Sequence, residues 1–167
     1  MSYAIVYDSR TGNTEALARA VAAALPSEGR LAFGRVDEVD RAAVAQADRV
    51  YAGFWTNRGD CGDELASLAD KDVFLFGTAG FGADETYFAG VMARVAVHLP
   101  ESARIVGTFM CQGRMPASVR ARYAQTAEAK PEQAARMHQL IENFDEAASH
   151  PDDDDLARLR EAVQAAS

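Results

Sequence analysis

The sequence of 167 residues contains little of what metal centres and disulfide frameworks are built from. It has two cysteines and three histidines. Cys61 and Cys111 lie far apart and form no Cys-x-x-Cys pair, which argues against a disulfide framework and against zinc-binding spacings. The histidines are scattered along the chain, so we expect no metal site.

Long hydrophobic runs are also missing. The apolar runs are short and interrupted, far below the roughly 20 residues that a transmembrane helix needs. The first six residues have neither a basic region nor a cleavage site, and they are typical of the start of a fold rather than of a signal peptide. We therefore expect a cytoplasmic protein without a membrane partner.

Positive charge is scarce. The chain has 17 lysines and arginines against 25 aspartates and glutamates, a net charge of −8, which disfavours nucleic-acid binding through a basic patch. An acidic surface suits a redox partner protein with a basic docking face, because complementary charges speed encounter. Acidity that only keeps the chain soluble is an equally good interpretation.

What the chain does contain is a regular alternation of strand and helix patterns. Apolar runs typical of strands occupy 3–7, 31–36, 49–55, 73–78 and 104–110. Patterns typical of helices occupy 17–25, 41–47, 63–69 and 87–99. This rhythm predicts βαβ units, and therefore a doubly wound α/β fold with a five-stranded parallel sheet and helices on both faces.

The last third of the chain is helical. It carries apolar stripes at 137–144 and 156–163, which His150-Pro151 separates, and the acidic run 152–155 suits the start of a helix. Hydrophobic residues make up 49 % of the chain, enough for one continuous core. We expect a single domain, with an α/β core over about 1–112 and a helical extension over about 113–167.

The junction between the first strand and the first helix is the most informative segment. It reads Ser9-Arg10-Thr11-Gly12-Asn13-Thr14. A helix start presents unpaired backbone N–H groups and the positive end of the helix dipole, and both attract an anion. Three hydroxyl groups can donate hydrogen bonds to phosphate oxygens, and Gly12 permits a positive φ angle. The loop indicates a phosphate monoester, and an ordinary helix start capped by Thr11 or Asn13 is the alternative.

Two other phosphate motifs are absent. The loop has no Gly-Lys-Ser/Thr, so it is not a Walker A loop. Gly80-Phe81-Gly82 is followed by Glu85 where a dinucleotide fingerprint has its third glycine.

The loop Ser9–Thr14 resembles the phosphate loop of flavodoxins, whose pattern is Ser/Thr-x-Thr-Gly-x-Thr. The resemblance extends over roughly the first 110 residues. It implies the flavodoxin-like fold, strand order 2-1-3-4-5, and FMN at the carboxyl ends of the strands, where the order switches direction. By that resemblance the FMN phosphate is cradled by Ser9, Arg10, Thr11, Gly12, Asn13 and Thr14.

Two further loops resemble the loops that hold the flavin ring. The first, after the third strand, contributes Trp55, Thr56, Asn57 and Gly59. Trp55 is the only tryptophan, and we expect it to stack on one face of the ring, with a half-buried plug of the sheet end as the alternative. Gly59 is expected to give a backbone hydrogen bond to the ring. Arg58 departs from the family pattern, and a position near the ring would make the reduction potential less negative, with an exposed arginine away from the ring as the alternative.

The second loop, after the fourth strand, contributes Thr78, Ala79, Gly80, Phe81, Gly82 and Tyr87. Flavodoxins often place a tyrosine in this loop to cover the outer face of the ring. Phe81 or Tyr87 is expected to serve instead here, although Tyr87 also begins a helical stripe and fits core packing. The segment 111–115 follows the fifth strand near the same edge, and strand-end packing explains it better than a partner contact does. It and the tail look like those of flavodoxin-like proteins encoded beside reductases.

The leading hypothesis is an FMN-binding electron carrier that passes electrons to a partner reductase and uses no side chain as acid or base. An accessory subunit of one dedicated reductase, for example of tetrapyrroles, is a special case of it. The first rival is an NAD(P)H-dependent FMN or quinone reductase on the same fold. The second is a binding module that keeps the scaffold without the flavin.

Overall fold

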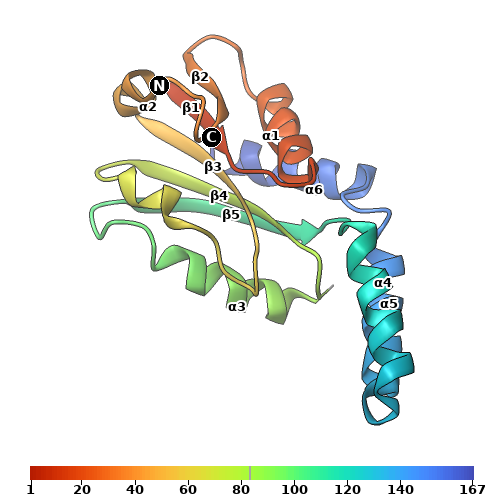
Figure 1. Ribbon diagram of the computed structural model, residues 1–167. Coiled ribbons are helices and arrows are strands. Elements are labelled where there is room, and N and C mark those ends of the chain that lie inside the picture. The colour runs from red at the N-terminus through yellow and green to blue at the C-terminus, as the bar shows by residue number, and fades with distance from the viewer. Residues whose placement is uncertain (83) are drawn as a thin grey trace.

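A computed structural model describes residues 1–82 and 84–167, with Asp63 and Glu64 described by their backbone only. Strands and helices alternate through the first two thirds, and the last third is helical (Figure 1). The strands are β1 (Tyr3–Tyr7), β2 (Arg30–Arg35), β3 (Arg49–Trp55), β4 (Asp72–Ala79) and β5 (Arg104–Gln112). The α-helices are α1 (Asn13–Ala24), α2 (Arg41–Gln46), α3 (Glu85–Ala96), α4 (Ala117–Ala129), α5 (Ala134–Ala147) and α6 (Asp153–Ala165). The 3-10 helices are η1 (Asp63–Ser67) and η2 (Pro131–Gln133).

The five strands form one parallel sheet in the order β2-β1-β3-β4-β5. This confirms the predicted flavodoxin-like fold and its strand order. Because β1 lies between β2 and β3, the chain reverses its direction of winding after β2, when it crosses β1 to reach β3. All strands run the same way, so the loops after β1, β3, β4 and β5 lie at one edge of the sheet, where doubly wound folds bind their ligands.

Helices cover both faces of the sheet. On one face, α1 and α6 pack on β-strand side chains such as Ile5, Tyr51 and Phe74. On the other, α3 and η1 pack on Phe54 and Leu75. The strands are apolar on both faces because both are covered, as in other parallel sheets.

A reciprocal contact between β3 and β4 sets the centre of the sheet. Gly53 pairs in register with Phe76, and Phe54 pairs with Gly77. A Cβ atom on Gly53 would lie 2.4 Å from the Phe76 ring, and one on Gly77 would lie 2.4 Å from the Phe54 ring. Each phenylalanine therefore occupies the space that its glycine partner leaves, one pair on each face of the sheet.

The C-terminal helices have two different roles. Helix α6 packs beside α1 and completes one helical layer, as expected for one helix of the extension. A capping box between Asp152 and Asp155 begins it, which confirms that the acidic run starts a helix. Helices α4 and α5 pack on each other as a hairpin that projects from the sheet (Figure 1). No residue of α4 is buried, which is why the sequence shows no apolar stripe there.

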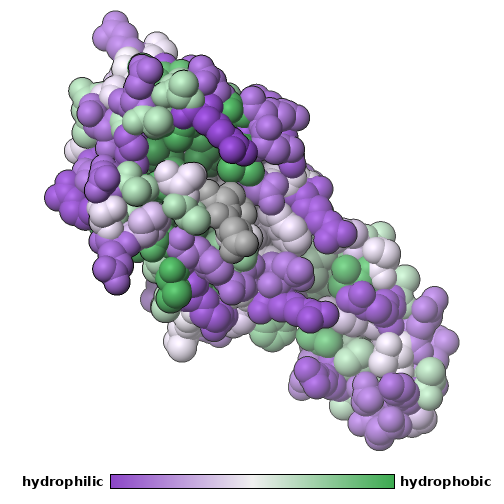
Figure 2. Space-filling view, turned by 60° about the vertical axis from the view of Figure 1, so that its left-hand side comes forward, coloured by the Kyte–Doolittle hydropathy of each residue, from purple (hydrophilic) through white to green (hydrophobic). Residues whose placement is uncertain are grey.

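Two elements differ from the sequence-based prediction in extent or type. The stripe predicted over 87–99 is helical only to Ala96, and the segment predicted over 63–69 is the 3-10 helix η1. A groove of about 720 Å³ lies between α2 and η1, lined largely by aliphatic side chains that include Val39, Val44 and Leu68. Figure 2 shows hydrophobic side chains exposed in a hollow on the molecule, and the helix hairpin as a separate lobe. The longest helix in the described part of the chain has 14 residues, and none could cross a membrane.

The contact between β3 and β4 predicts opposite effects of two glycine substitutions. Gly77→Ala forces a methyl group against the Phe54 ring, and we expect the free energy of unfolding to fall by about 1–3 kcal/mol. Gly90→Ala in α3 is the control, because its methyl group would meet only Arg94 Nη1, at 3.8 Å. A helical Gly→Ala change should raise stability by about 0.5–1 kcal/mol. Unfolding in guanidinium chloride measures the free energy of unfolding of both variants. Equal changes in the two would contradict the packing of Phe54 against Gly77.

Candidate functional site: a phosphate loop beside a cavity

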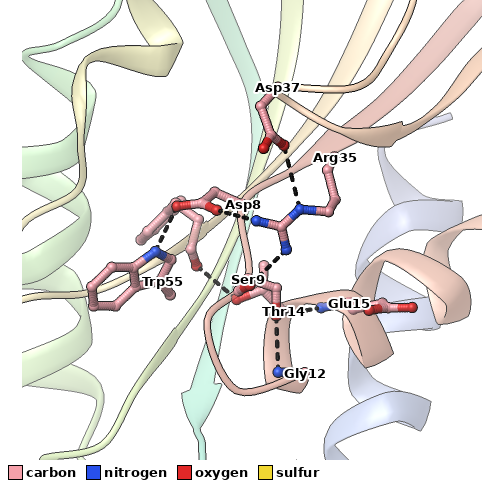
Figure 3. A network of polar contacts seen from close by, with 9 residues as sticks. Asp8, Ser9, Gly12, Thr14, Glu15, Arg35, Asp37 and Trp55 are labelled. Atoms are coloured by element: carbon pink, nitrogen blue, oxygen red, sulfur yellow. Dashed lines mark hydrogen bonds and ion pairs between the residues drawn. The ribbon is translucent and has the colours of Figure 1, made fainter.

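The loop between β1 and α1 has the backbone geometry of an anion site. Gly12 has φ +87° and caps α1, without any side-chain cap. Ser9 Oγ accepts the N–H groups of Gly12 and Glu15, at 3.2 and 3.3 Å (Figure 3). The N–H groups of Thr11, Asn13 and Thr14 have no partner among the residues that the structure describes. Open donors therefore gather at the positive end of the helix dipole.

The Thr14 hydroxyl is engaged elsewhere. Thr14 is fully buried, and its Oγ1 donates to the Phe54 carbonyl at 3.3 Å and lies 3.2 Å from Thr78 Oγ1. It therefore ties α1 to the ends of β3 and β4. The phosphate contact expected of this hydroxyl would require one of these bonds to be exchanged, whereas the exposed hydroxyl of Thr11 has no partner among the described residues.

A polar network holds Trp55 in place beside this loop. Trp55 Nε1 donates to Asp8 Oδ2 at 2.6 Å, and Arg35 Nη2 approaches Asp8 Oδ1 at 3.4 Å (Figure 3). Arg35 also donates to the Ser9 carbonyl at 2.8 Å, so one arginine braces both the loop and the tryptophan. Trp55 is half-buried, and the guanidinium of Arg10 lies 5.5 Å from its ring centroid. Both interpretations of Trp55, stacking platform and half-buried plug, are compatible with this position.

A cavity of about 330 Å³, at the small end of the range for ligand pockets, lies between this loop and the carboxyl ends of β3, β4 and β5. The residues predicted from the sequence that line it are Arg10, Thr11, Asn13, Trp55, Thr56, Asn57, Thr78 and Gly80. The other predicted residues border it without lining it or lie further away: Ser9, Gly12, Thr14, Gly59, Ala79, Phe81, Gly82 and Tyr87. Ala83, in the second predicted loop, lies outside the described residues.

The segment after β5 forms a further wall of the cavity. Strand-end packing was the role expected for this segment from the sequence. Gly113, Arg114, Met115 and Pro116 line the cavity, together with Ser118, Val119 and Arg122 of α4. A Cβ atom on Gly80 would lie 2.4 Å from the Met115 side chain, so Met115 covers the loop after β4. The position of 111–115 at the carboxyl end of a strand was the signal that could have identified this wall.

Asn13 joins the phosphate loop to this wall. Its Nδ2 donates to the Arg114 carbonyl at 2.9 Å, and Gly113 packs against its side chain. The Asn13 Oδ1 atom is buried and has no partner in the described residues. A buried acceptor without a donor is costly, so this oxygen is suited to a ligand hydroxyl.

The aromatic residues of the second loop do not cover the cavity in this structure. Phe81 is 51 % exposed and packs edge-on against Tyr87, with ring centroids 5.4 Å apart. Tyr87 packs against Gly82 and the core beneath α3. Their contact with a flavin ring stays a prediction.

The turn after β3 is held to α3. Asn57 and Asp60 exchange backbone hydrogen bonds of 2.9 and 3.2 Å, and Arg58 and Gly59 between them have positive φ angles. This is the backbone of a tight two-residue hairpin turn. The buried Gly59 carbonyl accepts Arg94 Nε at 2.8 Å, a bond that would have to break before this carbonyl could turn to a ring.

Two titratable groups near the site have shifted pKa values. Two hydrogen bonds lower the pKa of Asp60: the larger effect comes from the Cys61 backbone N–H, and the smaller from the His98 side chain. Burial raises the pKa of the Cys111 thiol, which is 1 % exposed, so this cysteine stays protonated. Two groups of potential metal ligands occur in the described residues, but in each a histidine already bonds a carboxylate, at 2.9 and 2.6 Å.

Helix α5 is anchored to the cavity wall by Asn143. Its Nδ2 donates to the Gly80 carbonyl at 2.8 Å, and its Oδ1 accepts the Gly82 N–H and Gln112 Nε2, each at 3.3 Å. Asn143→Ala should lower the free energy of unfolding by about 1–3 kcal/mol, because it leaves these partners unpaired. Hydrogen exchange at Gly82 should also speed up. His138→Ala, at an exposed position of the same helix, is the control, and equal effects of both would contradict the anchoring role.

Comparison with known proteins agrees with this architecture. The model of the flavodoxin domain family matches residues 4–164. The flavodoxin-like domain-containing protein BilS of Clostridium symbiosum (strain WAL-14163) is 37% identical, over 96% of this chain and 93% of its own length. BilS of Clostridioides difficile (strain CD3) is 26% identical, over 93% of this chain and 90% of its own length. The oxidised flavodoxin 2 of Bacillus cereus shares the fold, with a TM-score of 0.58 at 16% identity, over 99% of this chain and 97% of its own length. The chain belongs to the flavodoxin family.

Proposed function

We propose that this chain binds FMN without a covalent bond and passes electrons to a partner protein. The observation that carries the proposal is the set of unpaired backbone N–H groups at the start of α1, beside a cavity with an aromatic wall. Neutral donors of this kind suit a terminal phosphate.

The residues present fit the three parts of FMN. The open N–H groups of Thr11, Asn13 and Thr14 would hold the phosphate, and the unpartnered Asn13 Oδ1 would accept a ribityl hydroxyl. A Cβ atom on Gly12 would have no atom within 4 Å, so the space over the loop is open. Trp55, held by Asp8, would lie against the ring.

The residues that line the cavity favour an electron carrier over an enzyme that uses its side chains as acid or base. Its described lining contains no carboxylate, histidine, cysteine or lysine, so no group there can act as a general acid or base at neutral pH. FMN, when bound, supplies the redox chemistry. The protein's part is to bind the phosphate, hold the ring and limit the access of water.

A change at Gly12 tests the phosphate site. Gly12→Ala places a side chain at φ +87°, which costs about 1–2 kcal/mol and disturbs the loop. We expect FMN affinity to fall at least tenfold, with little change in the weaker binding of riboflavin, which lacks the phosphate. Gly29→Ala is the control: Gly29 also has a positive φ angle, +83°, and a Cβ atom there would lie only 2.9 Å from the Met1 carbonyl oxygen, so the change strains the chain at least as much, but it lies at the other edge of the sheet, before β2, and should leave FMN affinity unchanged. Quenching of Trp55, the only tryptophan, reports binding of either flavin.

Measurements of FMN binding and NADPH consumption on the wild-type protein distinguish an electron carrier from a reductase and from a binding module without flavin. Saturable FMN binding at micromolar concentration, followed by reversible reduction without steady consumption of NADPH, is the expected result. Absence of FMN binding would overturn the proposal and favour a binding module without flavin. Steady NADPH oxidation by the protein alone would replace the carrier with a reductase.

A further inference from the structure

Arginines without acidic partners surround the cavity. Arg10, Arg114 and Arg122 line it, and Arg58 lies next to the lining residue Asn57. All four are exposed. None of them forms an ion pair with any residue that the structure describes.

Three carboxylates that lie in the segments carrying these arginines, or bond to such a segment, are already paired. Asp8 is bound by Arg35 and Trp55, and Asp60 lies 2.9 Å from His98 Nε2. On the hairpin, Asp145 is bound by Arg120 at 2.8 Å. The described lining contains no acidic residue. The described lining of the cavity is therefore positively charged, on a chain whose net charge is −8.

A bound phosphate would not remove this positive charge. One phosphate monoester carries about two negative charges, against four arginines, and the loop meets it with neutral N–H groups. At least two guanidinium groups therefore keep their charge without an acidic partner, although Arg10 and Arg122 also lie 5.5 and 5.8 Å from the ring centroids of Trp55 and Tyr123. Surface cations left unpaired beside a ligand cavity are suited to a second negatively charged molecule.

The helix hairpin shapes the surface that this molecule would meet. Helix α4 contributes Ser118, Val119 and Arg122 to the cavity wall and then runs outward with α5 (Figure 1). The lobe in Figure 2 shows how far the hairpin projects. Asn143 anchors its inner end to the loop after β4. The arginines thus lie in the corner between the sheet edge and a projecting arm, a shape that receives a protein surface.

We propose that this corner, formed by Arg10, Arg58, Arg114, Arg122 and the adjoining side of α4, docks an acidic face of the protein that exchanges electrons with the bound flavin. The guanidinium fork pairs with carboxylates in a bidentate way, which suits such a contact. The inference rests on the proposed function. It differs from the basic partner that the net charge suggests, because contact depends on the charge near the site rather than on the total.

Oxidation by small charged reagents tests the local charge. The FMN-loaded, reduced protein is mixed with ferricyanide, an anion, and separately with tris(phenanthroline)cobalt(III), a cation. A positive corner attracts ferricyanide, so that its rate falls as salt is added, whereas the net charge of −8 alone would make it rise. The cobalt complex should show the opposite dependence.

Variants of equal net charge separate the corner from the rest of the surface. Arg114→Glu with Arg122→Glu should slow ferricyanide about tenfold at low ionic strength. Arg136→Glu with Arg160→Glu, at exposed positions outside the cavity, should change it less than twofold. Equal slowing by both pairs, or a ferricyanide rate that rises with salt in the wild type, would overturn the proposal.

A second measurement does not depend on flavin, so that failure of FMN binding and failure of the docking proposal are distinguishable. The full chain is titrated with a decaglutamate peptide and followed by NMR. We expect shifts centred on the four arginines, lost in the Arg114/Arg122 double variant and kept in the control pair. Absence of peptide binding, or binding undiminished in that variant, would overturn the proposal. Saturable NADPH binding at the same residues would then assign the arginines to a nucleotide.

Discussion

The reciprocal packing of Phe54 and Phe76 against glycines of the neighbouring strand is the constraint on which the site depends. It admits one register between β3 and β4, because a shift would place each ring on a side chain. That register places Trp55 opposite Thr78 at the carboxyl end of the sheet. Thr14 then reaches both strands from α1, so the phosphate loop, the tryptophan and the loop after β4 are held around one cavity.

A second layer of contacts stiffens this arrangement. Arg35 from β2 braces Asp8 and the Ser9 carbonyl, and Asp8 in turn holds Trp55. Asn13 and Asn143 connect the first loop and the helix hairpin to the other walls. Each of these side chains comes from a different element, so the cavity keeps its form without a ligand. A site of this kind binds its ligand with little rearrangement, which lowers the free-energy cost of binding.

The net charge of the chain and the local charge at the cavity have opposite signs, which the composition alone does not reveal. The chain as a whole carries a net charge of −8, whereas the cavity is bordered by arginines. Electrostatic attraction between proteins acts over about 8–10 Å at physiological salt, so the local charge decides which partner surfaces approach the site. The helix hairpin adds area there that the five-stranded core alone does not offer.

Much of the fold followed from the sequence by itself, because it rests on local patterns. Alternating apolar runs and helical stripes identified the strands and most helices, and the loop Ser9–Thr14 identified the strand order through its resemblance to flavodoxins. Helix α4 lacked an apolar stripe because it buries no residue. The roles of Phe81 and Tyr87 could not be derived, since each side chain has partners within its own loop and helix.

The amino-acid sequence determined the sheet, the loop Ser9–Thr14 at the start of α1 and the edge at which doubly wound folds bind their ligands, since periodicity and turn chemistry act between near neighbours. Only the tertiary structure decided that Thr14 turns inward, that Met115 covers Gly80, and that unpaired arginines gather at the cavity. These features join residues up to about a hundred positions apart, such as Asn13 and Arg114. No local pattern records such contacts, because they arise from how the elements pack.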